Sequence, residues 1–237
     1  MDRTKPDLRI SYLEHRSMLA DAARLTELVA GARPADVPRL DGVAAWYTRY
    51  EAAIHDHHRA EEAVVYPALL DRDPSFADAD GELEGEHLVL ADRLAVVGES
   101  LVGLADAASG GQWEHERDEA VKAAHALQAI LHIHLGHEEA VAFPRYSAAF
   151  TAAEFDDLGR IAWKQVGKRS VVFAGPWVLD HASAGERADL LAEQPLMLRL
   201  LYRLALRPKY ERLARPLRQS ASDLTSTPAA LSNENLR

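Results

Sequence analysis

The sequence contains no cysteine, little glycine and proline, and no long hydrophobic run. The absence of cysteine excludes disulfides and thiolate ligands, so any bound metal must be held by histidine and carboxylate groups. Only 13 glycines and 11 prolines occur among 237 residues, while alanine, leucine, glutamate and arginine are abundant, which favours helices. No run reaches the roughly 18 apolar residues of a membrane-spanning helix, and Met1–Pro6 lacks a hydrophobic signal segment, so we expect a cytoplasmic protein.

Basic side chains are also in the minority, and the formal net charge is −10. This balance argues against nucleic acid as the main partner, because phosphate binding needs a basic face. Hydrophobic residues make up 48% of the chain, which is enough for a proper core. The length fits one domain plus an extension better than two full domains.

Two stretches of the chain, 57–67 and 134–144, lie 77 residues apart and carry His, Glu, Glu, Ala, Val and Pro at the same positions. In each, a histidine is followed four residues later by a glutamate: His57 by Glu61, and His134 by Glu138. Four residues on a helix span about 400°, so the two side chains lie about 40° apart on one face. An imidazole and a carboxylate placed in this way can bind one metal ion.

Apolar residues recur with helical period in four segments, which predict an all-α, up-down-up-down four-helix bundle. The expected helices are residues 7–31, 41–70, 82–104 and 112–143. The first and third carry the dipeptides Glu14-His15 and Glu86-His87. Each half of the bundle therefore supplies a single histidine and then a His-x-x-x-Glu motif. The near-duplication predicts a pseudo-twofold axis with a two-metal centre on it.

The candidate ligands are four imidazoles and two carboxylates: His15, His57, His87, His134, Glu61 and Glu138. If each carboxylate bridges two ions, these residues give eight donor positions of the roughly dozen that two six-coordinate ions need. A bridging oxo or hydroxo group and an exogenous ligand would complete the set. Imidazole and carboxylate ligands suit iron or manganese better than zinc, which usually takes four ligands.

These residues resemble the hemerythrin-like family of HHE cation-binding domains. The resemblance rests on the two motifs, each closed by an aromatic residue and proline (Tyr66-Pro67 and Phe143-Pro144), and covers about residues 7–147. It implies a four-helix bundle with a centre of two non-haem iron ions, for which manganese is an alternative. It implies that the six residues above are ligands, and that the centre binds O2, NO or iron.

The chain departs from the oxygen carriers of this family at two points. Their third helix carries His-x-x-x-His, but Ala91 stands four residues after His87. Their fourth helix carries His-x-x-x-x-Asp, whereas here the glutamate follows His134 by four residues. The site has one imidazole fewer and more carboxylate, which leaves redox or sensing chemistry open. His58, beside His57, is a candidate for the extra metal ligand.

We expect Glu62 and Glu139 to face solvent or partners such as Arg59, while Glu14 and Glu86 either orient imidazoles or are exposed. Pro67 and Pro144 lack a backbone N–H and should end or kink their helices. The remaining histidines receive no ligand role: His55, His115, His125, His132, His137 and His181.

Residues 148–219 form a predicted helical extension, and residues 220–237 a disordered polar tail. Segments 151–154 and 183–186 have the pattern of capping boxes. Between residues 196 and 218, seven cationic side chains and one glutamate give a net charge of +6, which leaves −16 for the rest of the chain. Leucines interleave with these arginines. We expect the apolar face to pack on the bundle and the arginines to meet its acidic surface, rather than to bind a membrane surface or a protein partner.

Three functions remain open. The first is a binding protein in which two iron ions take up O2, NO or iron for sensing, storage or detoxification. The second is a redox enzyme at the same centre, with oxidase, peroxidase or NO-reducing activity. The third is an interaction module in which the metal is structural and the basic segment does the work.

Overall fold

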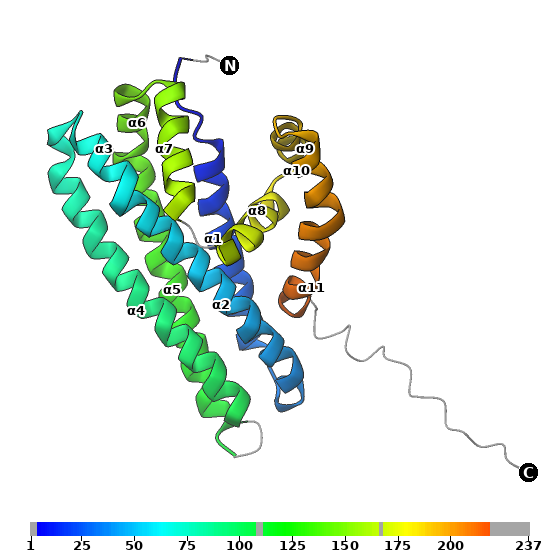
Figure 1. The fold of residues 1–237 in the computed structure, drawn as a ribbon. Coiled ribbons are helices and arrows are strands. Elements are labelled where there is room, and N and C mark those ends of the chain that lie inside the picture. Colours follow the sequence, from blue (N-terminus) through cyan, green and yellow to red (C-terminus); the bar gives the residue numbers. More distant parts are fainter. Residues whose placement is uncertain (1–3, 108–110, 166–167, 219–237) are drawn as a thin grey trace, which may run out of the picture.

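The structure is a computed structural model that describes residues 4–107, 111–165 and 168–218. These residues are almost entirely helical and include no strand. Four long helices run side by side as the bundle (Figure 1): α1 (Arg9–Ala30), α2 (Val37–Ala60), α4 (Ala77–Ala107) and α5 (Trp113–Val141). The all-α bundle expected from the sequence is confirmed. No described helix is long and apolar enough to cross a membrane.

Short helical segments join and extend the long helices. Within the bundle these are η1 (Pro34–Asp36), η2 (Glu61–Val65), α3 (Tyr66–Leu70), η3 (Pro74–Phe76) and α6 (Phe143–Ala149). The chain continues through α7 (Ala152–Gln165), α8 (Lys168–His181), α9 (Ala184–Ala192), α10 (Leu196–Leu201), η4 (Tyr202–Leu206) and α11 (Arg207–Arg218). Residues 220–237, expected to be disordered, lie outside the described residues.

The long helices form because their apolar residues fall on one face. In α4 the buried positions recur every three or four residues, as an amphipathic helix requires. They are Leu83, Leu90, Leu94, Val97, Leu101 and Leu104. One continuous core fills the bundle interior away from the histidine motifs, and a second, smaller core closes the other end. The histidines and glutamates of the two motifs therefore lie between the cores, while Tyr66 and Phe143 at the ends of the motifs belong to the second core.

Both motif prolines coincide with a break in regular α-helix. Before Pro67 the backbone makes one π-helical turn, η2, in which the N–H of Tyr66 donates to the carbonyl of Glu61. Before Pro144, helix α5 ends at Val141 and α6 begins two residues later. A proline cannot donate the hydrogen bond of a continuous helix, so the chain relaxes into a different register on the preceding turn.

The C-terminal helices are anchored on α1 and α2 by one buried ring. Helix α8 contacts both long helices, and the Trp177 ring lies 5.7 Å from the Tyr50 ring of α2. The Trp177 indole N–H donates to the buried carboxylate of Asp21 on α1, at 2.9 Å. His181 Nε2 lies 3.0 Å from the same carboxylate oxygen. Asp21 thus joins the bundle to the extension through two aromatic partners.

Helix α11 approaches α2 so closely that only glycine fits at the contact. A Cβ atom added at Gly42 would lie 2.6 Å from the ring of Pro216. Tyr210, Ala214 and Leu217 of α11 are buried there.

The expectation for the leucines of segment 196–218 was wrong. Leu196, Leu200, Leu201 and Leu204 are strongly exposed instead of packing on the bundle. The buried face of this segment is made later in the chain, by α11. The two predicted capping boxes are present: Glu154 accepts from the N–H of Thr151, and Ser183 and Glu186 cap α9 reciprocally.

Candidate metal centre

The bundle interior holds two adjoining groups of side chains that can bind metal ions. One group is His58, His87 and His134, and the other is His15, His57, Glu61 and Glu138. Within each group, one ligand atom per residue lies within 4.8 Å of all the others. All six ligands expected from the sequence, and His58, are therefore brought together. They come from α1, α2, η2, α4 and α5.

His57 and His58 point to different groups because successive side chains on a helix diverge by about 100°. The His58 ring stacks on the His87 ring of α4, with centroids 4.0 Å apart. It meets the His134 ring of α5 edge-on at 5.2 Å. His57 turns instead towards α1, where its ring lies 5.4 Å from that of His15. Adjacent residues on one helix thus belong to two different groups of candidate ligands.

The two carboxylates lie between the imidazoles. Glu61 Oε1 is 2.9 Å from His57 Nε2, and its Oε2 is 3.6 Å from His87 Nε2. Glu61 therefore reaches both groups. Glu138 Oε2 lies 3.2 Å from His15 Nε2. Both carboxylates are buried, with 6% and 1% of their surface exposed.

Seven buried atoms at this centre have no hydrogen-bond partner among the described residues. They are the Nε2 atoms of His15, His57, His58, His87 and His134 and the Oε2 atoms of Glu61 and Glu138. A buried polar group without a partner costs about 1–3 kcal/mol. Seven such atoms in one place are expected where a bound cation takes the role of the missing partner. The donor set fits a two-ion centre on this observation.

A second ring of carboxylates holds the other nitrogen of four imidazoles. Each outer glutamate contacts the Nδ1 atom of a histidine, at 2.7–3.4 Å. The pairs are His15 with Glu139, His57 with Glu14, His87 with Glu62, and His134 with Glu86. A carboxylate on Nδ1 fixes the ring so that Nε2 points inward, and it makes the imidazole a stronger donor.

The outer ring corrects one expectation and supplies the partners of Glu14 and Glu86. Glu62 and Glu139 do not simply face solvent, because each also contacts a buried imidazole. Each outer glutamate supports a histidine on a different helix, so Glu86 serves His134 and not its sequence neighbour His87. The Glu-Glu pair that occurs in both motifs was the sequence feature from which these contacts could have been predicted. Its first residue points inward and its second reaches a neighbouring helix.

His137 also joins this ring, although it was expected to be near the site only in sequence. Its Nδ1 lies 2.9 Å from Glu86 Oε1, on the carboxylate that holds His134. Its side chain is 25% exposed. It therefore positions Glu86 from the outside, without a place among the inner donors.

The contacts between the inner imidazoles and the outer glutamates follow the duplication of the sequence. The pairs His15–Glu139 and His57–Glu14 correspond to His87–Glu62 and His134–Glu86. The position equivalent to His58, 77 residues on, is the buried Leu135. This difference gives one group three imidazoles and the other two.

Protonation of the metal-free site differs between its groups. Burial disfavours a charged His15, but its contacts with Glu138 and Glu139 outweigh this and raise its pKa to about 9. Burial opposes a charged His57 too, and Glu61 and Glu14 raise its pKa well above 6.5. In the other group, burial lowers the pKa of His134 to about 4. Burial and the neighbouring imidazoles hold the pKa of His58 far below its usual value.

The two carboxylates are also unequal. Burial favours the neutral form of Glu138, but the contact with His15 and the charge on it outweigh this effect and lower the pKa to about 2. Burial and repulsion from Glu138 raise the pKa of Glu61. The metal-free site therefore stores protons on the His15 and His57 side, in ion pairs with carboxylates.

Metal uptake should consequently depend on pH more strongly at one position than at the other. A metal ion must displace the protons on His15 and His57, so affinity at the two-imidazole position should rise by at least about tenfold per pH unit up to about pH 9. The three-imidazole position should change less above pH 4, because His134 is already neutral. Titration of metal-free protein with Co2+ at several pH values, with the released protons counted, measures both. Equal pH dependence at the two positions would contradict the assignment.

The same shift affects the stability of the metal-free protein. The pKa of His15 is raised on folding, so its stabilising contribution is complete below pH 6.5 and is lost as the pH rises through about 9. Metal-free protein should thus lose stability over the range in which metal affinity increases.

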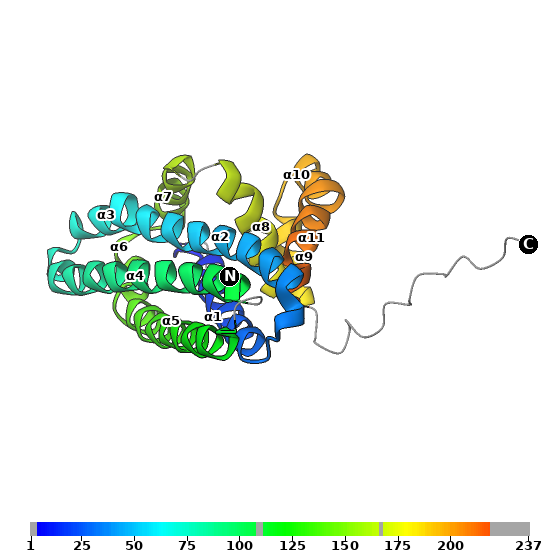
Figure 2. The same cartoon turned by 90° about the horizontal axis from the view of Figure 1, so that it is seen from below.

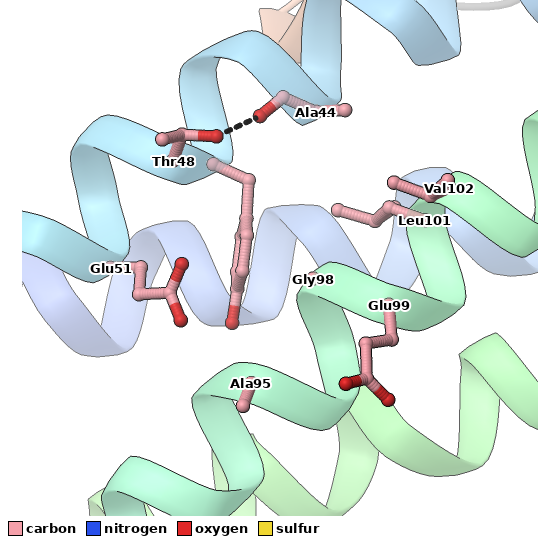
Figure 3. Close-up of a pocket in the computed structure, with 9 residues that line it drawn as sticks. Ala44, Thr48, Glu51, Ala95, Gly98, Glu99, Leu101 and Val102 are labelled. Carbon is pink, nitrogen blue, oxygen red and sulfur yellow. Dashed lines mark hydrogen bonds between the residues drawn. The ribbon is translucent and has the colours of Figure 1, made fainter.

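An open groove between α2 and α4 is separate from this centre (Figure 3). It has a volume of about 580 Å³ and a floor of small residues, including Ala44, Ala95 and Gly98. Glu51 and Glu99 stand on its two sides. It is lined by no histidine, so it offers an acidic, apolar surface and no metal position.

A helical bundle with a buried histidine and glutamate centre defines a class of cation-binding proteins. Residues 8–109 match the model of the family described as the hemerythrin HHE cation binding domain. This match confirms, over those residues, the resemblance to the family that the motifs indicated. The match spans α1 to α4 and ends before α5, so His134 and Glu138 join the centre on structural grounds. No curated protein and no solved structure matches the chain.

Proposed function

We propose that the chain binds two non-haem iron ions and uses them to take up O2 or NO, in sensing, storage or detoxification. Manganese is the alternative metal. The observation that carries the proposal is the convergence of five imidazole Nε2 atoms and two carboxylate oxygens, all buried and without partners. Imidazole and carboxylate donors in this ratio suit iron. When bound, two such ions supply redox chemistry and sites for a small exogenous ligand.

The inner and outer carboxylates give the centre its charge balance. Glu61 and Glu138 lie inside, and four outer glutamates contact the imidazoles from behind. Two divalent cations bring four positive charges into an apolar bundle, which would be very costly without such compensation. The protein thus orients the donors and neutralises the charge before an ion arrives.

The exogenous ligand should bind on the side of His15 and His57. That position has two imidazoles, whereas the other has three because His58 is added to it. Fewer protein donors leave more of the coordination shell open to a small molecule. The floor of the site is apolar there, with the Phe143 ring 5.3 Å from the His15 ring. This favours an uncharged diatomic ligand.

Metal analysis and ligand binding test the proposal. Protein from an iron-replete host should hold two iron ions per chain, and the diferrous form mixed with O2 or NO in a stopped-flow instrument should give a stable, reversible adduct. His58→Leu removes one of the three imidazoles at its position and should weaken iron binding there by roughly 10–100-fold in a chelator competition. The matched control His132→Leu, at an exposed position of α5, should bind both ions as tightly as the unchanged chain. Unchanged affinity in His58→Leu would refute the donor assignment.

A redox enzyme at the same centre is the second candidate, and two tyrosines favour it. The hydroxyls of Tyr66 and Tyr146 are buried without a hydrogen-bond partner in the described structure. The Tyr66 ring lies 6.2 Å from the His87 ring. Burial, and then the charges of Glu61 and Glu138, raise the pKa of Tyr66, so its hydroxyl stays protonated. A protonated phenol there can donate a hydrogen bond or a proton to a bound small molecule.

Turnover distinguishes the two candidates. Catalytic consumption of peroxide or NO by the iron-loaded protein, lowered in Tyr66→Phe at unchanged iron content, would establish the enzyme. Reversible binding without turnover would leave the binding protein. A cytoplasmic location and the lack of a nucleic-acid partner remain predictions.

A further inference from the structure

The segment from Leu196 to Leu204, formed by α10 and the start of η4, exposes an unusual amount of apolar surface. Six of the fifteen strongly exposed large apolar side chains in the described part of the chain fall within it. The other nine are scattered over α1, α4, α5 and α7, as is normal for a protein surface. We call the following residues the leucine face: Leu196, Met197, Leu200, Leu201 and Leu204.

The leucine face points away from the protein. Tyr202 is the buried residue of this segment, with 6% exposed, and it anchors the segment to the fold. Met197 and Leu204 are 79% and 78% exposed, and residues at 197, 200, 201 and 204 share one side of a helix. Figures 1 and 2 both show α10 at the outer edge of the molecule, beside α9 and α11 and away from α4 and α5.

Cationic side chains flank the leucine face. Arg207 pairs with Glu211, and Arg218 with Asp180. Five other cations of this region have no carboxylate within ion-pair distance among the residues that the structure describes. They are Arg199, Arg203, Lys209, Arg212 and Arg215. The rest of the chain carries a net charge of −16, so this end is the positive pole of an acidic protein.

We propose that the leucine face and its flanking cations dock the protein on an anionic lipid bilayer. The apolar side chains enter the boundary between headgroups and acyl chains, and the arginines stay with the lipid phosphates through their long stems. Each cation near such a surface adds about 1 kcal/mol of attraction, or roughly fivefold in affinity. The acidic rest of the chain is repelled by the anionic lipid, so the molecule is oriented with the leucine face towards the bilayer.

The shape of the apolar surface favours a bilayer over a protein groove. Leu198, on the flank of the leucine face, is itself 43% exposed, so apolar groups cover most of the circumference of α10. A groove covers one stripe of a helix, whereas a bilayer surrounds an inserted helix more widely. The competing occupant is a second copy, whose groove between Glu51 and Glu99 is apolar and acidic.

Vesicle binding by the full-length, metal-loaded chain tests the proposal. The protein should sediment with vesicles of phosphatidylglycerol and phosphatidylcholine but not with phosphatidylcholine alone. Raising the salt from about 0.1 M to about 0.5 M should weaken the binding severalfold, because it screens the headgroup charge.

Two double variants separate the apolar and the cationic contributions. Met197→Asp with Leu204→Asp should lower the partition coefficient by at least roughly tenfold, as should Arg203→Glu with Arg212→Glu. The matched control, Val102→Asp with Ile161→Asp, changes two exposed apolar residues of α4 and α7 and should bind as the unchanged chain does. Equal metal content and melting temperature verify that all variants fold.

The remaining outcomes overturn the proposal. Equal binding to neutral and anionic vesicles would exclude a role for the cations and for anionic lipid, and binding to neither would remove the bilayer as the occupant. Self-association in analytical ultracentrifugation, lost in Met197→Asp with Leu204→Asp and in Glu51→Lys with Glu99→Lys, together with absent vesicle binding, would assign the face to a second copy. None of these results depends on the identity of the metal, so they leave the proposed iron centre standing.

Discussion

Replacing Glu61 by glutamine is expected to lower metal affinity at both positions of the centre. Glu61 lies 2.9 Å from His57 on one side and 3.6 Å from His87 on the other, so its charge serves both groups. Loss of a partner that only supports a ligand costs roughly 10–100-fold in affinity, and loss of a shared inner carboxylate should exceed about 100-fold. Metal content after dialysis against a weak chelator measures the effect.

Glu51→Gln is the matched control for this variant. Glu51 lies on the same helix, but on the groove side and away from the histidines. It should keep its full metal content. If Glu61→Gln retained both ions at unchanged affinity, a bridging role for Glu61 would be excluded.

The second large effect concerns stability. Asp21→Ala should lower the free energy of unfolding by about 2–4 kcal/mol, because it removes a buried carboxylate that two groups of α8 contact. The buried indole N–H of Trp177 loses its hydrogen-bond acceptor, and Nε2 of His181 loses the carboxylate oxygen that lies 3.0 Å away. Asp21 itself has no exposed surface, so water cannot replace the lost contacts. Urea denaturation of the metal-loaded chain measures the change.

Arg24→Ala provides the comparison at the same carboxylate. Arg24 pairs with Asp21 at 2.9 Å, but its side chain is 44% exposed, and such pairs contribute about 0–1 kcal/mol. An Asp21→Ala variant no less stable than Arg24→Ala would show that the extension is held by apolar packing alone.

The bundle and its inner donors were predictable because both depend on local periodicity. A histidine and a glutamate four residues apart share a helix face in any helix, and the repeat at 57–67 and 134–144 placed two such faces together. The distribution of the outer glutamates was not predictable. Whether Glu86 contacts His87 or His134 depends on which helices are neighbours and how each is rotated about its axis. The spacing of residues along one helix predicts neither of these.

The exposed leucine face was missed for a related reason. Alternating leucines and arginines predict an amphipathic helix but do not say which side faces the protein. Here Tyr202 provides the anchor and the leucines turn outward. The π-helical turn before Pro67 could not be predicted from the sequence pattern either. A proline indicates that the regular α-helix is interrupted, but it does not indicate that the interruption is a wider turn beginning at Glu61.

The outer ring of glutamates has a consequence for proton traffic. Glu14, Glu62, Glu86 and Glu139 keep 21–42% of their side chains exposed while contacting Nδ1 of a buried imidazole. Each therefore links bulk water to the interior in a single step. Protons that a metal ion displaces could leave, and protons that a bound molecule requires could enter, through any of these four glutamates. The centre can remain dry and closed while its charge state follows the solvent.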